Sequence, residues 1–344
     1  MIAAQKLIRG IGSSRNLKTE LNINGDEIVF LVTGKHFNDA HGSEFFDSIN
    51  IKQFVRTGAI VEEREVEKAY QQFLESKATY IIAVGGGSVI DLAKAIVYRC
   101  IQSSLPVPFF IVIPTTAGSG SEATHFAVVY KGKKKNSLMH PSLLPAVTIL
   151  DSKLLSSLSS YQTAVSGMDA LSQAVESYWN KNATAESKGF AKQAIFGWEK
   201  YFLKAVNDAD EVSLDELLWA SYLAGKAINI TRTTGPHALS YHLTANYGIP
   251  HGQAVAIFLP VFFLYNDINE ELCSLLGVKN SIEAMDQIQL AMKAAGLAID
   301  LASLGLDKNV ILPALLDEVN EERFSNNPVP FDREKLMELF TEYL

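Results

Sequence analysis

The sequence contains only two cysteines, Cys100 and Cys273, among its 344 residues. So few cysteines exclude a disulfide framework and are typical of proteins in a reducing cytoplasm. Long hydrophobic runs are also missing, because the longest, from Ala254 to Tyr265, is broken by Pro260 and is too short to cross a bilayer. The first ten residues have no basic region followed by an apolar stretch. We therefore expect a cytoplasmic protein with no signal peptide and no membrane partner.

Basic residues are fewer than acidic ones, and the formal net charge at pH 7 is -8. This balance argues against nucleic acid as the main partner, and we interpret the short cluster Lys131–Lys135 as a solvated turn. Apolar residues make up 48% of the chain and charged residues 20%, as in ordinary globular proteins. The length is sufficient for two domains, each with its own core.

Continuous apolar runs at residues 28–33, 80–84 and 109–113 predict strands that are buried on both faces, as in a parallel sheet. Apolar residues at helical spacing in 66–74 predict a helix between two of them, and 126–130 and 147–150 are shorter strand candidates. From residue 164 onward the pattern is helical nearly to the end. We therefore predict an α/β domain with a parallel sheet over residues 1–155 and an all-α domain over 156–344.

Two polar turns follow predicted strands. Gly85, Gly86, Gly87 and Ser88 lie between a strand and a helix, where glycines allow close approach of an anion and the helix start offers free N–H groups. A pyrophosphate fits there; the alternative is a tight turn without a ligand, and the pattern is not G-x-G-x-x-G. The second turn contains four hydroxyl side chains that would lie at the same edge of the sheet: Thr115, Thr116, Ser119 and Ser121.

Histidines and a carboxylate in the second half suggest a metal site. His237 falls in a helix-compatible run, and His251 follows a Gly-Ile-Pro break. Asp169 and Gln173 are four residues apart on one face of a predicted helix that is apolar on most sides, where a carboxylate needs a partner. Two histidines and one carboxylate can hold a divalent ion and leave positions open for a substrate oxygen. The alternative is that these side chains only cap helices.

At these residues the sequence resembles the iron-containing alcohol dehydrogenase family. The resembling motifs, in the family's order, are Gly85-Gly-Gly-Ser-x-x-Asp91-x-Ala-Lys94, Pro114-Thr-Thr-Ala-Gly-Ser-Gly-Ser-Glu122, Gly167-x-Asp169-Ala-Leu-x-x-Ala-x-Glu176 and His237-x13-His251-Gly252. The resemblance implies an N-terminal nucleotide-binding α/β domain and an all-helical C-terminal domain, the architecture shared with dehydroquinate synthase.

The resemblance also implies site residues. The turn Gly85–Ser88, with Asp91 in the same motif, would bind the pyrophosphate of NAD(P)H, and the second turn would line the cofactor. Asp169, His237 and His251 match three of the family's four metal ligands, so we expect Fe²⁺ or Zn²⁺.

Three positions depart from the family pattern. The fourth metal ligand, a histidine in the family, is Gln173 here, whose amide oxygen is a weaker ligand. Tyr241 stands where the family often has a histidine suited to proton relay, and the adjacent His242 is about 100° round the helix. At the end of the first strand, Gly34 and Lys35 replace the acidic residue that often binds the adenosine ribose, so NADPH is acceptable.

Within the family, the chain looks most like phosphonoacetaldehyde reductases. We expect metal-assisted hydride transfer between NAD(P)H and a small aldehyde, with an anionic aldehyde as a candidate, in a homodimer. The expected catalytic residues are His237, His251, Tyr241 and His242. Positive charge for an anionic tail could come from Arg232, with His125, His140 and His242; the alternative is that each of these is a surface or capping residue. Three alternatives stay open: a metal-free reductase, a dehydroquinate synthase-like enzyme that closes a ring on a sugar phosphate, and a non-catalytic nucleotide-binding protein.

Overall fold

A computed structural model describes residues 5–17, 23, 26–41, 46, 49–58, 60–132 and 134–344. The chain forms two compact units. Unit 1 comprises Met1–Thr116 and Gly120–Ser156, and unit 2 comprises Ala117–Ser119 and Ser157–Leu344. The main passage from unit 1 to unit 2 therefore comes after Ser156, while the predicted division into two domains at residues 155 and 156 stays a prediction.

Unit 1 is built on a six-stranded sheet in the order β1-β8-β5-β4-β2-β3. Its strands are β1 (Lys6–Arg9), β2 (Ile28–Gly34), β3 (Asn50–Arg56), β4 (Tyr80–Gly85), β5 (Phe109–Pro114) and β8 (Val147–Leu150). Every neighbouring pair is parallel, so the strands end at one common edge. There Gly34 is in register with Arg56, and Gly85 with Pro114. Both polar turns predicted from the sequence follow strands that end at this edge.

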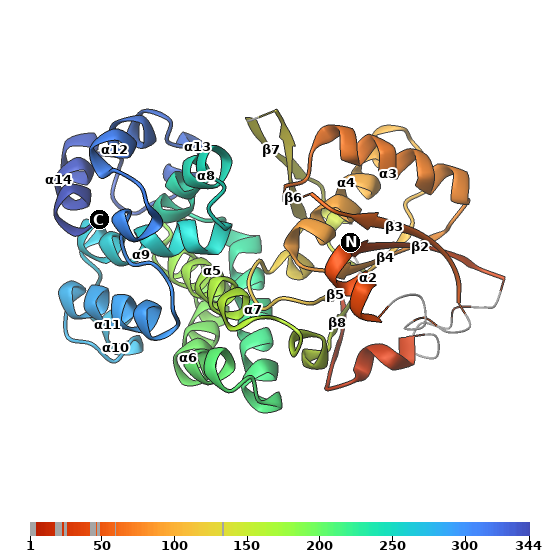
Figure 1. The fold of residues 1–344 in the computed structure, drawn as a ribbon, viewed down its shortest axis with the longest axis horizontal. Helices are drawn as coiled ribbons and strands as arrows, with labels where there is room; N and C mark the ends of the chain where they lie inside the picture. The colour runs from red at the N-terminus through yellow and green to blue at the C-terminus, as the bar shows by residue number, and fades with distance from the viewer. Residues whose placement is uncertain are drawn as a thin grey trace. The chain divides into compact units, whose positions relative to one another are not determined.

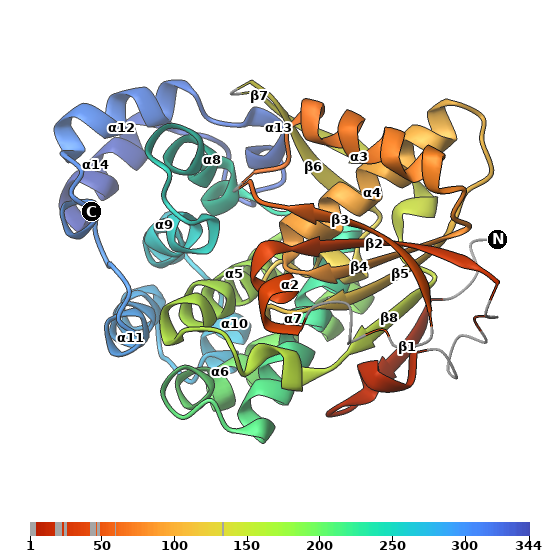
Figure 2. The same ribbon diagram turned by 45° about the vertical axis from the view of Figure 1, so that its right-hand side comes forward.

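Each face of the sheet is covered by its own apolar cluster, because successive side chains of a strand point to opposite faces. Phe30, Ile81 and Val112 belong to one cluster, together with side chains of α3 (Glu63–Ser76) and α4 (Gly87–Gln102). Figure 2 shows α3 and α4 on this side of the sheet. Leu31 and Ile82 belong to the cluster on the other face, which includes Phe37 of the short helix α2 (Lys35–His41). Burial on both faces explains the continuous apolar runs.

The strands predicted at residues 28–33, 80–84, 109–113, 126–130 and 147–150 are confirmed, as is the helix around 66–74. Strands β1 and β3 were missed, because β1 is short and β3 is an edge strand with polar residues such as the exposed Asn50 and Lys52. The lysine-rich segment predicted as a turn is largely strand. There β6 (Phe126–Lys131) pairs with β7 (Lys134–Met139) in an antiparallel hairpin.

Unit 2 is helical, as predicted from residue 164 onward. Its helices are α5 (Ser160–Trp179), α6 (Ala185–Asn207), α7 (Glu211–Thr231), α8 (Gly235–Tyr247), α9 (His251–Asn266), α10 (Glu270–Leu275), α11 (Ser281–Ala294), α12 (Lys308–Asp317), α13 (Glu321–Phe324) and α14 (Arg333–Tyr343). In Figure 1, α11, α12 and α14 lie around α9. Helix α9 is buried on nearly all sides, which accounts for its long apolar run.

Helix α5 is the other buried helix of unit 2, and its interior contains the polar side chains of Asp169, Gln173 and Glu176. It begins with a capping box, in which Ser159 and Gln162 bond each other's backbone N–H groups. A buried helix with three polar residues on one stripe must satisfy them locally. The candidate site therefore lies around these polar side chains of α5.

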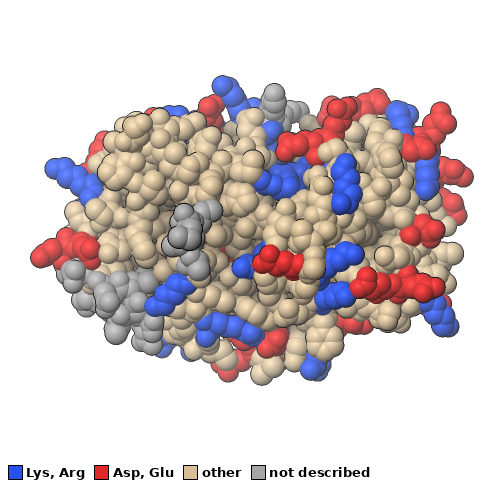
Figure 3. Space-filling view, turned by 180° about the vertical axis from the view of Figure 1, so that it is seen from behind, with Lys and Arg blue, Asp and Glu red and all other residues tan. Residues whose placement is uncertain are grey.

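No helix among the described residues is both long and apolar enough to cross a membrane. On the face drawn in Figure 3, acidic and basic side chains are interspersed rather than gathered by sign.

Candidate active site

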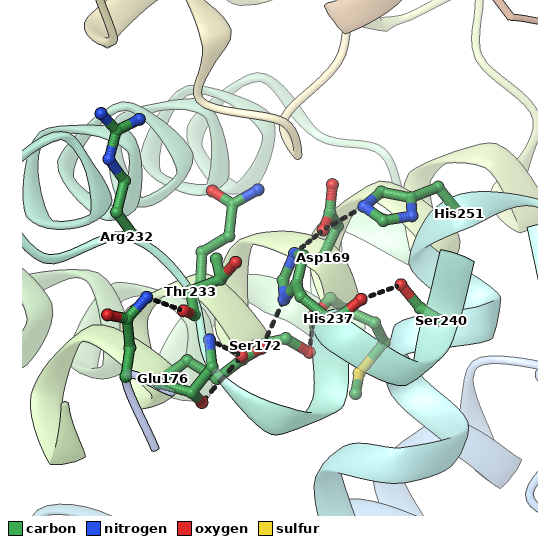
Figure 4. Close-up of polar contacts among 12 residues, drawn as sticks. Asp169, Ser172, Glu176, Arg232, Thr233, His237, Ser240 and His251 are labelled. Carbon is green, nitrogen blue, oxygen red and sulfur yellow. Dashed lines mark hydrogen bonds and ion pairs between the residues drawn. The ribbon is translucent and has the colours of Figure 1, made fainter. Parts of the chain in front are cut away.

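Three helices of unit 2 bring Asp169, His237 and His251 together. Asp169 lies on α5, His237 on α8, and His251 is the first residue of α9. One side-chain ligand atom from each lies within 4.8 Å of the others. The Oδ1 atom of Asp169 is 3.3 Å from Nε2 of His237 and 4.0 Å from Nε2 of His251 (Figure 4). The structure thus assembles the three residues that the sequence predicted as metal ligands.

A second carboxylate fixes the orientation of His237. Glu176, which is fully buried, binds Nδ1 of His237 through Oε1. Its other oxygen, Oε2, accepts hydrogen bonds from the Thr234 backbone N–H at 2.6 Å and from the Thr234 hydroxyl at 2.9 Å. With Nδ1 held by Glu176, Nε2 of His237 is the nitrogen that faces Asp169. A carboxylate–histidine pair of this kind orients a histidine ligand and increases its basicity.

The charges of the site shift both pKa values. Burial alone would lower the pKa of His237, but the charge of Glu176, with the hydrogen bonds that His237 donates to both carboxylates, raises it to about 9. Burial would raise the pKa of Asp169, yet the hydrogen bond it accepts from His237 and the positive charges of the two histidines lower it. Without an ion, the site therefore favours a positive charge between two carboxylates.

Two buried oxygen atoms of the site are poorly satisfied. Among the described residues, Gln173 Oε1 has no hydrogen-bond partner, and Asp169 Oδ1 has no well-aligned donor although His237 Nε2 lies 3.3 Å away. The Nε2 group of Gln173 donates to the Ser119 carbonyl at 3.1 Å, and the Gln173 side chain also lowers the pKa of Asp169 by hydrogen bonding. Buried oxygens of this kind are costly unless a cation or donor approaches them. The donor set of two imidazoles and one carboxylate fits a divalent ion.

The position of His251 depends on a close approach between α9 and α5. A Cβ atom added to Gly252 would lie 2.1 Å from the Val165 carbonyl oxygen, so only glycine fits at this crossing. The break at Pro250 starts α9, and His251 follows at its first position. The His251 side chain keeps 39% of its surface exposed, whereas the Asp169 and His237 side chains are nearly covered. His251 therefore marks the open side of the cluster.

The two residues considered for proton relay lie differently. The Tyr241 ring stacks on His251, with centroids 6.0 Å apart and planes 10° from parallel. His242 instead binds Glu318 Oε2 through Nδ1 at 2.8 Å and lies against Tyr247. These contacts lie away from the cluster, as the 100° rotation between adjacent helical positions requires. The geometry therefore places Tyr241, rather than His242, beside the cluster.

In unit 1, the glycine turn has the features of an anion site. Helix α4 starts at Gly87 with Gly86 as N-cap, with no side-chain cap and no acidic residue in its first turn. Its first N–H groups and the positive end of its dipole are thus not used by the helix itself. The Thr115 N–H donates to the Gly85 carbonyl, and a Cβ on Gly86 would come within 3.3 Å of Thr116. The two predicted turns therefore lie against each other.

A buried arginine supports this turn. Arg56, at the end of β3, donates from Nη1 to the Ser88 hydroxyl and from Nη2 to the Ile60 carbonyl at 2.9 Å. It also pairs with Glu65 at 3.3 Å. Sequence reasoning missed Arg56. The feature that could have identified it is a basic residue at the carboxyl end of a parallel strand, the edge where open sheets commonly bind ligands.

Asp91 and Gly34 were also predicted to contact the cofactor. The Asp91 carboxylate accepts bonds from the Ser121 hydroxyl and the Val128 N–H, so it ties α4 to the following segment. Nearby, the buried Lys94 ammonium donates to backbone and hydroxyl oxygens of Ser121 and Thr124. This geometry favours a structural role for Asp91. Gly34 ends β2 at the ligand-binding edge, with the exposed Lys35 starting α2.

Glu176 and Thr234 are the residues of the metal cluster that sequence reasoning did not assign to the site. Glu176 stands two helical turns after Asp169, on the same stripe as Gln173. A carboxylate at that spacing on an apolar helix was a usable signal.

Comparison with known proteins gives consistent matches. Residues 4–152 match the family described as iron-containing alcohol dehydrogenase, and residues 163–344 match the C-terminal part of the Fe-containing alcohol dehydrogenase family. Long-chain-alcohol dehydrogenase 1 of Geobacillus thermodenitrificans is 29% identical over 294 residues, which are 77% of this chain and 74% of that protein.

Two further matches are reductases of anionic aldehydes by name. Phosphonoacetaldehyde reductase of Streptomyces viridochromogenes is 31% identical over 218 residues, which are 57% of this chain and 55% of that protein. The crystal structure of sulfoacetaldehyde reductase from Bifidobacterium kashiwanohense, in complex with NAD⁺, superposes with a TM-score of 0.91 at 27% identity. That alignment covers 98% of this chain and 96% of the other.

Proposed function

The chain belongs to the iron-containing alcohol dehydrogenase family and is an oxidoreductase acting on CH–OH groups, and we propose that it reduces a small anionic aldehyde with NAD(P)H. The family implies a divalent metal and a nicotinamide nucleotide. The observation that carries the proposal is the cluster of Asp169, His237 and His251, whose ligand atoms lie within 4.8 Å of one another.

Each residue of the cluster has its own role in the proposed reaction. Asp169, His237 and His251 would hold the ion, Gln173 Oε1 is the fourth candidate ligand, and Glu176 keeps the proton of His237 on Nδ1. A divalent ion, iron or zinc, would supply Lewis-acid polarisation of a carbonyl when bound. Bound NAD(P)H would supply the hydride for the carbonyl carbon, and the carbonyl oxygen would need a proton to give the alcohol. Tyr241, stacked on His251, is the candidate for conducting that proton.

The glycine turn of unit 1 serves the cofactor in this proposal. Gly86, Gly87 and Ser88 present the start of α4 to the pyrophosphate, while Thr115, Thr116 and Ser119 line the nucleotide. Gly34 and Lys35 place no carboxylate beside the ribose, so both NADH and NADPH are accepted. A homodimer and a cytoplasmic location remain predictions.

An aldehyde panel with both reduced nicotinamides tests this function. The panel contains phosphonoacetaldehyde, sulfoacetaldehyde, and neutral aldehydes of the same length, and nicotinamide oxidation is followed by absorbance. We expect reduction of the short aldehydes, with the anionic ones preferred in kcat/KM. Absence of reduction with every aldehyde and both nicotinamides, in metal-loaded protein, would contradict the proposal.

A further inference from the structure

Arg232 adopts a backbone conformation that side chains normally avoid. It follows α7 with φ 68 and ψ -179, a region occupied almost entirely by glycine. Lys77 and Asp267 also follow helices with positive φ, but their ψ values of 25 and 72 lie nearer the left-handed helical region. Arg232 is therefore strained where glycine would be relaxed. Strained side chains of this kind persist where the surroundings fix them, and they concentrate at functional sites.

The surrounding hydrogen bonds fix this conformation. The Arg232 N–H donates to the Ile228 carbonyl at 2.8 Å, and the Arg232 carbonyl accepts from the Thr231 hydroxyl at 2.8 Å and from Asn180 Nδ2 at 3.3 Å. The next carbonyl, of Thr233, accepts from Asn326 Nδ2 at 3.1 Å. These bonds hold residues 231–233 in one geometry and set the direction in which the Arg232 side chain leaves the backbone.

The same segment leads directly into the metal cluster. Thr234, two residues on, binds Glu176, which binds His237. His237 is five positions after Arg232, so their Cα atoms lie at most about 18 Å apart. In Figure 4, the Arg232 side chain extends away from Glu176, and its guanidinium is drawn apart from Asp169 and His251. Residues 233–236 thus join the Arg232 position to His237 of the cluster through a short segment.

Charges of both signs act on Arg232. Burial, first, and then the positive charge of Arg323 lower the pKa of Arg232, while the charge of Glu322 acts in the opposite direction. Arg323 is itself buried and lies on α13. An anionic substrate group near the two guanidinium groups would offset the repulsion between them.

We propose that Arg232 binds the anionic group of the substrate, a tetrahedral oxyanion such as a phosphonate or sulfonate on a short aldehyde. This assignment rests on the proposed function. A guanidinium donates paired N–H groups to the oxygens of such an anion, which gives both affinity and orientation. The strained backbone then has a purpose, since it directs the side chain of Arg232 while the cluster receives the carbonyl end.

The test compares Arg232→Gly, Arg232→Gln and Arg232→Lys with the wild type, all metal-loaded. We expect the first two to raise KM for phosphonoacetaldehyde and sulfoacetaldehyde by roughly ten- to hundredfold, the effect of losing a hydrogen bond to a charged group. Arg232→Lys should lose less. KM for a neutral aldehyde of the same length, and kcat with it, should stay within about twofold. Comparing the two anions shows which oxyanion Arg232 prefers.

A binding measurement separates recognition from chemistry. Ethylphosphonate and ethanesulfonate, which cannot be reduced, should raise the Tm of the metal-free wild type and not that of Arg232→Gly. The matched control is Lys77→Gly, which removes a cation with positive φ after α3 in unit 1. It should leave KM for every aldehyde unchanged.

Other outcomes have distinct meanings. An equal change in KM for anionic and neutral aldehydes, or no change in either, would overturn the role of Arg232 while leaving aldehyde reduction intact. A wild type that reduces no aldehyde, yet binds ethylphosphonate through Arg232, would overturn the proposed function and retain the anion site. Arg232→Gly should fold with a Tm no lower than the wild type, because glycine relieves the backbone strain.

Discussion

Replacing Glu176 with glutamine should weaken metal binding without touching a metal ligand. Glu176 is fully buried, and its two oxygens accept from His237 on one side and from Thr234 on the other. A glutamine has the same shape but only one accepting oxygen. If the oxygen faces His237, the amide N–H₂ meets the Thr234 N–H donor. If the N–H₂ faces His237, the proton must move to Nε2, which then cannot bind an ion.

The expected magnitude follows from these two choices. Loss of the partner that orients a histidine ligand lowers metal affinity by about ten- to hundredfold, or about 1.4–2.8 kcal/mol. The first choice also leaves a buried donor unsatisfied, which costs the metal-free protein about 1–3 kcal/mol of unfolding free energy. The assay is competition with a coloured chelator, which gives Kd for Zn²⁺, together with urea unfolding of the metal-free protein.

The matched control is Glu318→Gln, which removes the carboxylate partner of His242 outside the cluster. The Glu318 side chain is 63% exposed, so this change should leave Kd for Zn²⁺ and the unfolding free energy nearly as in the wild type. Wild-type metal affinity in Glu176→Gln would refute the reasoning, because it would mean that His237 needs no carboxylate to present Nε2.

Three further changes give expected outcomes. Gly252→Ala should shift His251 and weaken metal retention on dialysis, since its Cβ would meet the Val165 carbonyl at 2.1 Å; wild-type retention would show that α9 can move freely. Gln173→His should raise the metal retained after chelator treatment, measured by elemental analysis, and unchanged retention would exclude this position as a ligand. Glu122→Gln removes a buried carboxyl whose pKa burial raises to about 7. Between pH 4.5 and 7 the folded wild type binds more protons than the unfolded chain, so its unfolding free energy should fall by on the order of 3 kcal/mol as the pH rises. Urea unfolding of the variant should lack this fall, and parallel pH curves for the two proteins would contradict the reasoning.

The sheet of unit 1 was predictable where burial dictates composition. Strands β2, β4 and β5 are covered on both faces, so their sequences are apolar except for Thr33 in β2, and they end at glycine or proline. The edge strand β3 has one neighbour, and its polar alternation is indistinguishable from a loop. The hairpin of β6 and β7 was partly missed, because lysines in an exposed strand look like a turn.

The residues that gather at the candidate site were predictable from the sequence. The residues that contact and orient them were less so. Asp169 and Gln173 were found because polar residues on an apolar helix need partners. Glu176 contacts His237, and Arg56 contacts Ser88. Both contacts depend on which helix or strand packs alongside, which the sequence does not reveal. The strain at Arg232 is a property of φ and ψ, so no residue pattern reveals it. Asp91 was assigned by its motif, whereas its hydrogen bonds favour the interior of unit 1.

The central claim is that Asp169, His237 and His251 hold a divalent ion on which aldehyde reduction depends. The most direct measurement is NAD(P)H oxidation with a short aldehyde before and after chelation, with metal content determined in the same samples. The claim predicts that activity is lost with the metal and returns when Fe²⁺ or Zn²⁺ is added, and that His251→Ala neither retains metal nor recovers. Full activity in a metal-free preparation would contradict it.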